Sequence, residues 1–506
     1  MKIFYTCIGS LSKVFYDLHK SLADLNNIES GFYLTDKIYT SKFLIENKIK
    51  LKNSIKEWDL IEECKKDKKV LKKNIKDVIN KELLWKAAVA DRRIYNGIYT
   101  KYTQSFNSHL NHKFILNLMC YSYAKIYNHL KIFKPDLIVG HSTGTFGIFI
   151  TYLVSKKLGI NFVNLRHTKI NNYVTFTEGI DEKYQHIRKK FEKKKLNKKS
   201  IDIAKKFISK YRHQKNFKYI GSPFFKLSTK LFFLDSLRKL PGAIYSGIKY
   251  SLFLKSKIDL HSLNHPIKTY YYDNILRLTR SLRINKYVKQ VNNIKDLGKY
   301  AFFPLHAEPE LSLSVLANSY QNQIETIRNL SFRLPPDTKL VVKDHPRNYC
   351  RRNLGYLDKI NKIPNVVLID TKTSTRELIK NSNINIVLSG FIGFEAVILK
   401  KPVITFSSSI INMLPKNMVL QVKNFEEFEN KYLNFLENYK HNEKILLNFI
   451  SSIVENSRPV DLMNVLLKKK DRYGKKFSKK EYERNQVELK KLFLDFIKKN
   501  LLINLN

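Results

Sequence analysis

The residues with the clearest chemical potential lie in a short turn at 343–347, which reads Lys-Asp-His-Pro-Arg. Pro346 disfavours a helical backbone for the residue before it, so His345 is expected in an extended turn at the end of a strand. A histidine between Lys343 and Arg347 can donate a hydrogen bond to a phosphate, and the two cations attract the phosphate charge. The turn therefore predicts an anion site, although an ordinary surface turn of a basic protein would have the same composition.

A second turn, at 389–395, begins with Ser389 and joins an apolar strand to an apolar helix. Gly390 and Gly393 allow the backbone to approach a ligand closely, and the first turn of a helix offers unpaired N–H groups that suit a phosphate. Glu395, one turn into the helix, can accept hydrogen bonds from sugar or ribose hydroxyls. The alternative is a helix start without a ligand, in which Glu395 only favours the helix dipole.

Acid–base chemistry has candidates at two other strand ends. His306, Glu308 and Glu310 follow the first strand expected in the second half of the chain, where Glu308 is our candidate proton acceptor. In the first half, His141 ends a buried strand and is a candidate general base toward an acceptor hydroxyl. A solvated histidine at a helix start is the alternative for His141, and a soluble turn rich in carboxylates is the alternative for the other loop.

The elements that must position these turns alternate between strand and helix. Such alternation, with Gly, Ser or Pro at the strand exits, is typical of a parallel sheet with helices on both faces. In the second half we expect strands at 299–306, 338–346, 365–370, 384–390 and 401–406, and helices at 321–334, 373–382 and 391–400. In the first half we expect strands at 2–9, 134–141 and 160–166 and a helix at 145–158. Because ligands bind beyond the carboxyl ends of such strands, the chemistry should lie in these turns, facing a cleft between two domains.

The chain divides by charge and pattern into a Rossmann-like domain at 1–180, a basic helical insertion at 181–299, a second Rossmann-like domain at 300–465 and a basic helical tail at 466–506. Residues 181–300 hold 30 Lys and Arg against 8 Asp and Glu, mixed with Phe, Leu and Tyr. Such basic amphipathic segments can lie on an anionic bilayer, but a helical insertion packed on the protein body has the same pattern. The tail ends in a similar segment, which is a second candidate anchor.

Composition excludes several classes of protein. Of the 506 residues 43% are hydrophobic, which is enough for real cores and rules out a disordered chain. Lys and Arg number 92 against 44 Asp and Glu, and this net charge of +48 favours anionic partners without naming one. The sequence has no signal peptide, no membrane-spanning run and no paired-cysteine or metal-ligand motif, which predicts a cytoplasmic protein without disulfides or a bound metal. The motifs of α/β-hydrolases, P-loop kinases, zinc proteases and metal-dependent DxD transferases are missing as well.

Taken together, several segments resemble a known family: FFPLHAEPE, KLVVKDHP, SNINIVLSGFIGFEAVILKKPVITF, a helix with two glutamines at 321 and 323, and Leu-Pro at 334–335. They are similar to the capsular polysaccharide biosynthesis glycosyltransferases of bacteria, which have the GT-B fold and are related to the Kdo-transferring capsule enzymes. The His-Pro element followed by a Ser/Gly turn also resembles sialyltransferases that use CMP-sugars. The match covers residues 300–410, about a fifth of the chain.

The resemblance implies roles for individual residues. His345, Ser389 and Gly390 would hold the phosphate of the donor nucleotide, and Glu395 would bind a hydroxyl. The family also implies an acidic residue followed by Gly as the catalytic base, for which Glu178 is the nearest match in this sequence.

We therefore predict an α/β, GT-B-like fold and a metal-independent glycosyltransferase that needs no cofactor. It would transfer a sugar from a CMP- or UDP-linked donor, bound by 300–465, to a lipid-linked or growing glycan bound by 1–180. The basic segments would hold it peripherally on the inner face of the cytoplasmic membrane. A sugar-nucleotide epimerase and a polyol-phosphate transferase of the same fold remain alternatives. A nucleic-acid-binding protein is an alternative of another class, and we expect no nucleic-acid partner because no aromatic RNA-binding motif is present.

Overall fold

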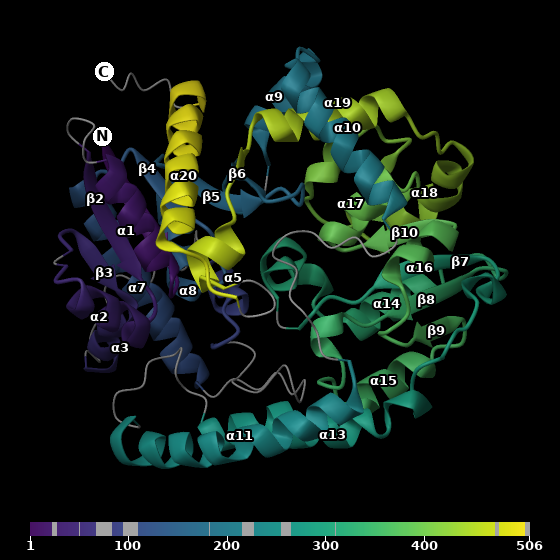
Figure 1. Ribbon diagram of the computed structural model, residues 1–506, viewed down its shortest axis with the longest axis horizontal. Coiled ribbons are helices and arrows are strands. Elements are labelled where there is room, and N and C mark those ends of the chain that lie inside the picture. Colours follow the sequence, from purple (N-terminus) through teal and green to yellow (C-terminus); the bar gives the residue numbers. More distant parts are fainter. Residues whose placement is uncertain are drawn as a thin grey trace. The chain divides into compact units, whose positions relative to one another are not determined.

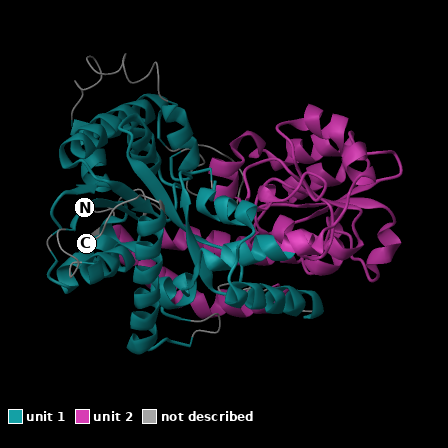
Figure 2. Ribbon diagram, turned by 90° about the horizontal axis from the view of Figure 1, so that it is seen from above, with its two compact units in different colours: residues 1–94, 110–224, 447–506 teal, residues 95–109, 225–446 magenta. Residues whose placement is uncertain are grey.

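The computed structural model describes residues 1–22, 28–49, 51–66, 83–94, 110–181, 183–214, 227–254, 265–308, 310–470 and 475–500. The chain forms two compact units, which Figure 2 shows in different colours. Unit 1 comprises Met1–Ile94, Leu110–Phe224 and Leu447–Asn506, and unit 2 comprises Tyr95–His109 and Phe225–Leu446. Each unit is built around one sheet covered by helices (Figure 1).

Unit 1 contains a seven-stranded sheet with the strand order β13-β6-β5-β4-β1-β2-β3. The strands are β1 (Lys2–Cys7), β2 (Glu29–Leu34), β3 (Ser54–Lys56), β4 (Leu137–Gly140), β5 (Asn161–His167), β6 (Tyr173–Glu178) and β13 (Arg458–Pro459). The strands from β5 to β3 run parallel, whereas β6 is antiparallel to β5 and β13 is antiparallel to β6.

The helices of unit 1 are α1 (Leu11–Leu22), α2 (Lys37–Glu46), α3 (Glu57–Lys66), α5 (Leu84–Ala90), α7 (His112–Phe133), α8 (Phe146–Lys157), α9 (Gln185–Lys193), α10 (Lys198–His213), most of α19 (Glu443–Glu455) and α20 (Lys479–Asn500). Side chains of β1 alternate between the two faces of the sheet, as a strand requires. Ile3 and Tyr5 lie in the core that α1 and α20 cover, while the ring of Phe4 packs against Phe133 of α7 on the other face, with centroids 6.2 Å apart.

Unit 2 contains a six-stranded sheet with the order β12-β11-β10-β7-β8-β9, in which every pair is parallel. Its strands are β7 (Tyr300–Pro304), β8 (Lys339–Lys343), β9 (Val366–Ile369), β10 (Ile384–Val387), β11 (Val403–Thr405) and β12 (Val419–Gln421). Its helices are α11 (Thr229–Lys249), α12 (Pro266–Tyr270), α13 (Leu276–Ser281), α14 (Gln323–Ser331), α15 (Leu354–Asn361), α16 (Thr375–Asn381), α17 (Phe391–Ile398) and α18 (Phe425–Glu437).

Local sequence explains where the helices of unit 2 begin. Asn322, Ser374 and Asn424 each accept a hydrogen bond from a backbone N–H three residues later, at the first turns of α14, α16 and α18. Short polar side chains at this position satisfy N–H groups that have no partner inside the helix. The caps Ser374 and Asn424 start α16 and α18 a few residues after β9 and β12, so these two connections are short.

The predicted fold class is confirmed: both units are α/β, and parallel strands dominate both sheets. The five strands expected in the second half are β7 to β11, and those expected in the first half are β1, β4 and β5. The antiparallel strands β6 and β13 were not expected. The four cysteines are buried and free. Within the described part of the chain, no helix combines the length and hydropathy needed to cross a bilayer.

The two basic segments fold differently from each other. The stretch expected as one insertion at 181–299 is helical, but α9 and α10 belong to unit 1 and α11 to α13 belong to unit 2. The tail helix α20 buries Leu489, Phe493 and Phe496 in the core of unit 1. That apolar face is therefore not available to a membrane, which corrects the prediction of an anchor for the tail up to residue 500; residues 501–506 lie outside the described residues.

Candidate active site

Three loops of unit 2 leave the same edge of its sheet side by side, because β7 lies between β10 and β8 and all three strands are parallel. Pro304 on β7 pairs with Lys343 on β8, and His306 and His345 each follow two residues later. The pairing of β10 with β7 brings Ser389 to the same level. The topology therefore gathers the three predicted turns at one carboxyl edge, with His306 in the central loop.

His345 is held in one tautomer by its own turn. Its Nδ1 accepts a hydrogen bond from the backbone N–H of Arg347 at 3.0 Å. An accepting Nδ1 carries no proton, so the neutral ring has its proton on Nε2, where it can be donated. Burial lowers the pKa of His345 to about 4, although Glu310 acts in the opposite direction. At physiological pH His345 is therefore a neutral hydrogen-bond donor and not a cation.

The loop after β10 approaches His306 closely. Gly390 has φ +98° and ψ −168°, a backbone region essentially reserved for glycine, and a Cβ added there would lie 3.3 Å from Cε1 of His306. Ser389 is 4% exposed, and its Oγ has no hydrogen-bond partner among the described residues. Nε2 of His306 is buried and equally lacks a partner there. Because buried polar atoms are rarely left unpaired, two of them on facing loops mark a place for a polar ligand.

Glu310 lies beside both histidines. Its Oε2 is 3.7 Å from Nδ1 of His306. Burial opposes ionisation of Glu310, but its interactions with His306, His345 and Arg347 outweigh burial and hold the pKa of Glu310 below its ordinary value. Glu310 is thus an ionised carboxylate between the loops after β7 and β8.

Glu308, which the sequence suggested as a proton acceptor, lies instead in a buried ion network. Arg352, whose side chain is 1% exposed, pairs with Glu308 at 2.9 Å and with Asp344 at 2.9 Å. The hydroxyl of Tyr356 donates to Glu308 at 3.1 Å. Nη2 of Arg352 also donates to the carbonyl of His306 at 2.6 Å. The network ties the loop after β7 to the loop after β8, so Glu308 supports the site without facing a ligand.

Lys343 also supports the site from within. Its side chain is 5% exposed, and Nζ donates to Oγ1 of Thr375 at 2.6 Å, which holds the start of α16. Burial lowers the pKa of Lys343 to about 8, against the charges of Asp344, Asp370 and Glu395. Glu395 is half-buried on α17, so its carboxylate is electrostatically coupled to Lys343 across the sheet edge.

Arg347 is exposed to solvent, whereas Gly393 is buried against the sheet. Arg347 is exposed next to His345, where its guanidinium can meet an anion from solution. Gly393 faces the sheet, and a Cβ added there would lie 2.8 Å from Cδ1 of Ile411 and 3.1 Å from Cγ2 of Val387. Close packing of α17 on the sheet therefore requires this glycine, and the expected ligand contact at Gly393 is replaced by a packing role.

In unit 1, His141 follows β4 at the carboxyl edge of the sheet. Its Nδ1 lies 2.8 Å from the carbonyl oxygen of Leu165 and so donates to it, which leaves the lone pair on Nε2. Burial, aided by the charges of Arg166 and Lys169, lowers the pKa of His141 to about 4. Since a general base works best with a pKa near the operating pH, His141 is better suited to bind a hydroxyl than to remove its proton.

Glu178 lies apart from His141. Because β6 runs antiparallel to β5, its last residue, Glu178, pairs with Val163 near the start of β5, whereas His141 follows the end of β4. The carboxylate of Glu178 accepts from Nδ1 of His186 at 3.0 Å and from the backbone N–H of Gln185 at 3.0 Å. Glu178, the candidate catalytic base that the resemblance implied, therefore has partners within its own unit.

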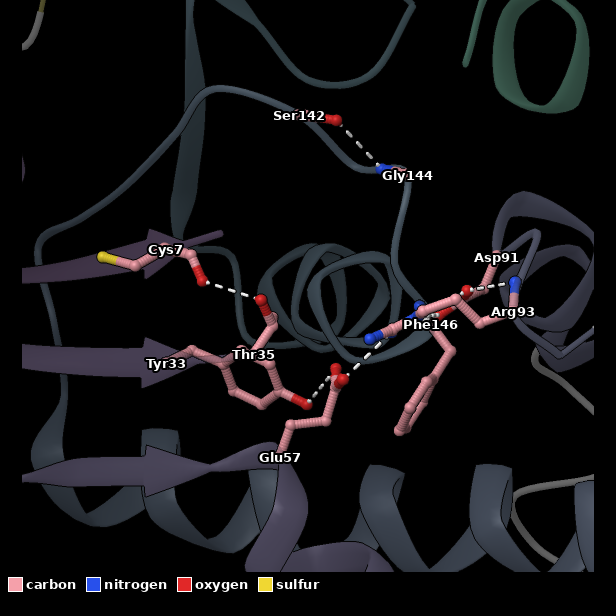
Figure 3. Close-up of polar contacts among 9 residues, drawn as sticks. All are labelled: Cys7, Tyr33, Thr35, Glu57, Asp91, Arg93, Ser142, Gly144 and Phe146. Atoms are coloured by element: carbon pink, nitrogen blue, oxygen red, sulfur yellow. Dashed lines mark hydrogen bonds and ion pairs between the residues drawn. The ribbon is translucent and has the colours of Figure 1, made fainter. Parts of the chain in front are cut away.

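A second buried ion network supports the edge of unit 1 (Figure 3). Arg93 donates from Nη2 to Glu57 at 2.9 Å and from Nε to Asp91 at 2.8 Å. Asp91 also accepts from the backbone N–H of Phe146, the first residue of α8, at 2.9 Å, and Tyr33 donates to Glu57 at 3.2 Å. The network fixes α3, α5 and α8 around the end of β2, and the sequence offered no signal for it.

Sequence reasoning found the loops of unit 2 but missed part of their chemistry. Arg352 lies in a basic stretch, where nothing marks one arginine as buried. Glu310 and Glu308 were indistinguishable from sequence, although the first lies beside two histidines and the second beside Arg352. Two carboxylates in one loop with a histidine were the available signal, and only the side-chain positions separate them.

The comparison with known families falls on this site. Residues 251–414 match the family model described as "Capsule polysaccharide biosynthesis protein". The matched stretch contains the three loops after β7, β8 and β10, and it confirms the resemblance noted in the sequence. No curated protein matches the chain.

Solved structures with similar folds include capsule enzymes and epimerases. The Thermosulfurimonas dismutans KpsC β-Kdo 2,7 transferase is 12% identical, with a TM-score of 0.35, over 82% of this chain and 98% of the other. The β-Kdo 2,4 transferase of the same KpsC is 12% identical, with a TM-score of 0.34, over 66% and 87%. The UDP-GlcNAc 2-epimerase of Methanocaldococcus jannaschii is 14% identical, with a TM-score of 0.25, over 89% and 96%.

Proposed function

We propose that this chain is a glycosyltransferase of capsule-type polysaccharide assembly that binds a CMP- or UDP-linked sugar at the carboxyl edge of unit 2. The observation that carries the proposal is a pair of buried atoms on the loops after β7 and β10, Nε2 of His306 and Oγ of Ser389, which have no hydrogen-bond partner within the part of the chain that the structure describes. They lie beside the start of α17 and at the level of His345, all inside the stretch that matches the capsule family. Hydroxyls and phosphate oxygens of a nucleotide-sugar would supply the missing partners.

The same groups would assist the chemical step. When the bond between the sugar and the phosphate breaks, its electron pair stays on the phosphate oxygen and negative charge grows there. The N–H groups at the start of α17 and Nε2–H of His345 are fixed donors at this edge, and fixed donors aimed at developing charge usually supply the largest catalytic effect. In this scheme side chains and backbone provide the countercharge, with no cofactor. Among the described residues no cluster of three or more His, Cys, Asp or Glu side chains is placed to hold a metal ion.

A thermal-shift panel of CMP, UDP, GDP and CDP tests the donor site. One nucleotide at a hundred times its Kd should stabilise the protein by about 2.7 kcal/mol, and His345→Ala should abolish that shift. The chain offers a matched control in His265, which also precedes a proline and whose Nδ1 also accepts a backbone N–H two residues on, at 3.3 Å. His265→Ala should keep the shift. No shift with any nucleotide would refute the proposal, and release of a free epimer from UDP-N-acetylglucosamine would favour the epimerase instead.

We further propose that helix α11 holds the protein against an anionic membrane surface. Nine large apolar side chains of α11 and the turn after it are 37–69% exposed: Leu231, Phe233, Leu234, Leu237, Leu240, Ile244, Tyr245, Ile248 and Leu252. The helix also carries four basic side chains and one acidic side chain: Lys230, Arg238, Lys239, Lys249 and Asp235. An exposed apolar stripe flanked by cations suits anionic lipid, to which each well-placed Lys or Arg contributes about 1 kcal/mol.

Sedimentation with lipid vesicles tests this surface. The protein should bind vesicles of phosphatidylcholine and phosphatidylglycerol in equal parts, and bind far less to phosphatidylcholine alone. The double variant Leu237→Glu, Ile248→Glu should lose most of the binding. Ile132→Glu, which alters an 80% exposed side chain on α7, is the matched control and should bind normally. Equal sedimentation of the double variant and the control would refute the membrane role and leave a protein partner for this face.

In this proposal the acceptor is a lipid-linked or growing glycan, which unit 1 binds on the cytoplasmic side of the membrane. The proposal includes no nucleic-acid partner. His141 presents Nε2 as an acceptor for a glycan hydroxyl. His141→Ala should therefore lower turnover without changing the nucleotide-induced thermal shift. A loss of the nucleotide shift in this variant would contradict the separate role of unit 1.

A further inference from the structure

His306 is fixed in place by its main chain. Its backbone N–H donates to Oε1 of Gln323 at 2.7 Å, and its carbonyl accepts from Nη2 of Arg352 at 2.6 Å. The side chain is only 9% exposed. A ring so held has little freedom to turn away, so the positions of its two nitrogens are set by the fold.

The two nitrogens of His306 have different surroundings. Nδ1 faces Oε2 of Glu310 at 3.7 Å, whereas Nε2 has no hydrogen-bond partner among the described residues. Cε1 of the ring, which is bonded to both nitrogens, lies close to Gly390, since a Cβ there would be 3.3 Å from it. A carboxylate at one nitrogen and a vacant position at the other is the arrangement in which a histidine is oriented by one partner and acts on another.

We infer that His306 is the general acid of the proposed transfer and that Glu310 positions it and stabilises its protonated form. The inference rests on the proposed function. In the step, the bond between the anomeric carbon and the phosphate oxygen breaks, and its electron pair goes to that oxygen. The proton on Nε2 of His306 passes to the departing phosphate, and the acceptor hydroxyl oxygen bonds to the anomeric carbon and releases its proton to water. His306 then regains a proton from solvent.

The charges around His306 come from three loops. Glu310 on its own loop faces the ring, His345 on the loop after β8 interacts electrostatically with it, and Arg347 acts on Glu310 and His345. Arg352 and Glu308 neutralise each other behind the His306 carbonyl. The loop after β10 adds only the neutral Ser389 and Gly390. Glu310 is therefore the single nearby carboxylate, among the described residues, whose charge is directed at the ring.

Two variants test the inference once the thermal-shift panel has named the nucleotide. With commercial sugars linked to that nucleotide, His306→Asn should lower kcat about 100- to 10,000-fold, the range typical of a lost general acid. Its Kd for the free nucleotide should rise less than tenfold. Glu310→Gln should lower kcat less and move the alkaline limb of the kcat profile to lower pH, because the imidazolium loses its carboxylate. A merely structural role of Glu310 would not move that limb.

The pair His441 and Glu443, whose Nε2–Oε2 distance is 3.0 Å, supplies the control, and His441→Asn should leave kcat unchanged. His306→Gln serves if His306→Asn fails to fold. A kcat within threefold of the wild type in a folded His306 variant would overturn the inference, as would an unmoved pH profile in Glu310→Gln. Either result would leave the proposed function intact provided that the wild type binds a nucleotide, whereas absence of nucleotide binding would refute the function itself.

Discussion

Replacing Arg352 with Met should damage unit 2 more than any change at its surface. The substitution keeps much of the side-chain volume but removes the charge that pairs with Glu308 and Asp344, each at 2.9 Å. Removing one partner of a buried ion pair costs about 3–5 kcal/mol, because the charge left behind has no compensation. Here two carboxylates are left, and the loops carrying His306 and His345 lose their common tie.

The cost can be worked out for Asp344. Burial already raises its pKa, and Arg352 is the main group that lowers it, so without Arg352 the carboxyl must take up a proton to stay buried. Against an unfolded pKa of about 3.9, protonation at pH 7 costs about 4 kcal/mol, and at pH 5 it costs about 1.5 kcal/mol. The raised folded pKa means that the folded variant holds the extra proton. The variant should therefore lose stability as the pH rises and recover most of it near pH 5.

Hydrogen exchange of peptides from β7 and β8 measures the change where it occurs. Trp58 and Trp85, the two tryptophans of the chain, both belong to unit 1, so their fluorescence during urea unfolding reports on the other unit. Arg351→Met is the matched control, because Arg351 pairs with Asp273 at 3.0 Å while 21% exposed, and such pairs contribute about 0–1 kcal/mol. Equal protection in the two variants at pH 7, or an equal loss at pH 5 and pH 7, would refute the reasoning.

Two other predictions concern one residue in each unit. Gly390→Ala should lower the free energy of unfolding by about 1–3 kcal/mol, because alanine is strained at a φ of +98°. It should also weaken the nucleotide-induced thermal shift, because the new Cβ would lie 3.3 Å from Cε1 of His306. Gly159→Ala, at φ +69° with nothing within 4 Å, should show backbone strain alone and keep the nucleotide shift; identical behaviour of the two would contradict a ligand at Gly390. Burial raises the pKa of Glu57 to about 7 in spite of Arg93, so folded unit 1 holds a proton that the unfolded chain releases between about pH 4.3 and pH 7. Unit 1 should lose stability across that interval as the pH rises, measured by its tryptophan fluorescence in urea, and Glu57→Gln should flatten the dependence; an unchanged slope would contradict the assignment.

Most of the sheet of unit 2 was predictable because its signals are local. Strands β7 to β11 are apolar runs between turn residues, and of the helices between them α14, α15 and α16 begin at Asn or Ser caps, whereas α17 begins at Gly390. Four strands of unit 1 were missed, β2, β3, β6 and β13, and the last three carry weaker signals. β3 has three residues, β13 has two, and β6 returns antiparallel next to a parallel strand, which no local pattern encodes.

The tail shows how one pattern fits two environments. The apolar stripe of α20 and the apolar stripe of α11 look alike in sequence, since both are basic and amphipathic. In the structure Phe493 is fully buried on the sheet of unit 1, whereas Leu237 is 57% exposed. An apolar stripe on a helix predicts that this face will be buried against something. Only the tertiary structure shows whether another part of the same chain buries it.

By itself the sequence determined the fold class and the strand ends that are followed by the turns with His345, Ser389 and Gly390, because turns are set by neighbouring residues. The tertiary structure alone decided which of two carboxylates, Glu308 or Glu310, meets the histidines. The strand order places His306 between two other loops. The buried Arg352 forms an ion pair with Glu308, which leaves Glu310 as the carboxylate beside His306. Contacts between residues far apart in the chain depend on strand order and burial, and the spacing of those residues along the sequence predicts neither of them.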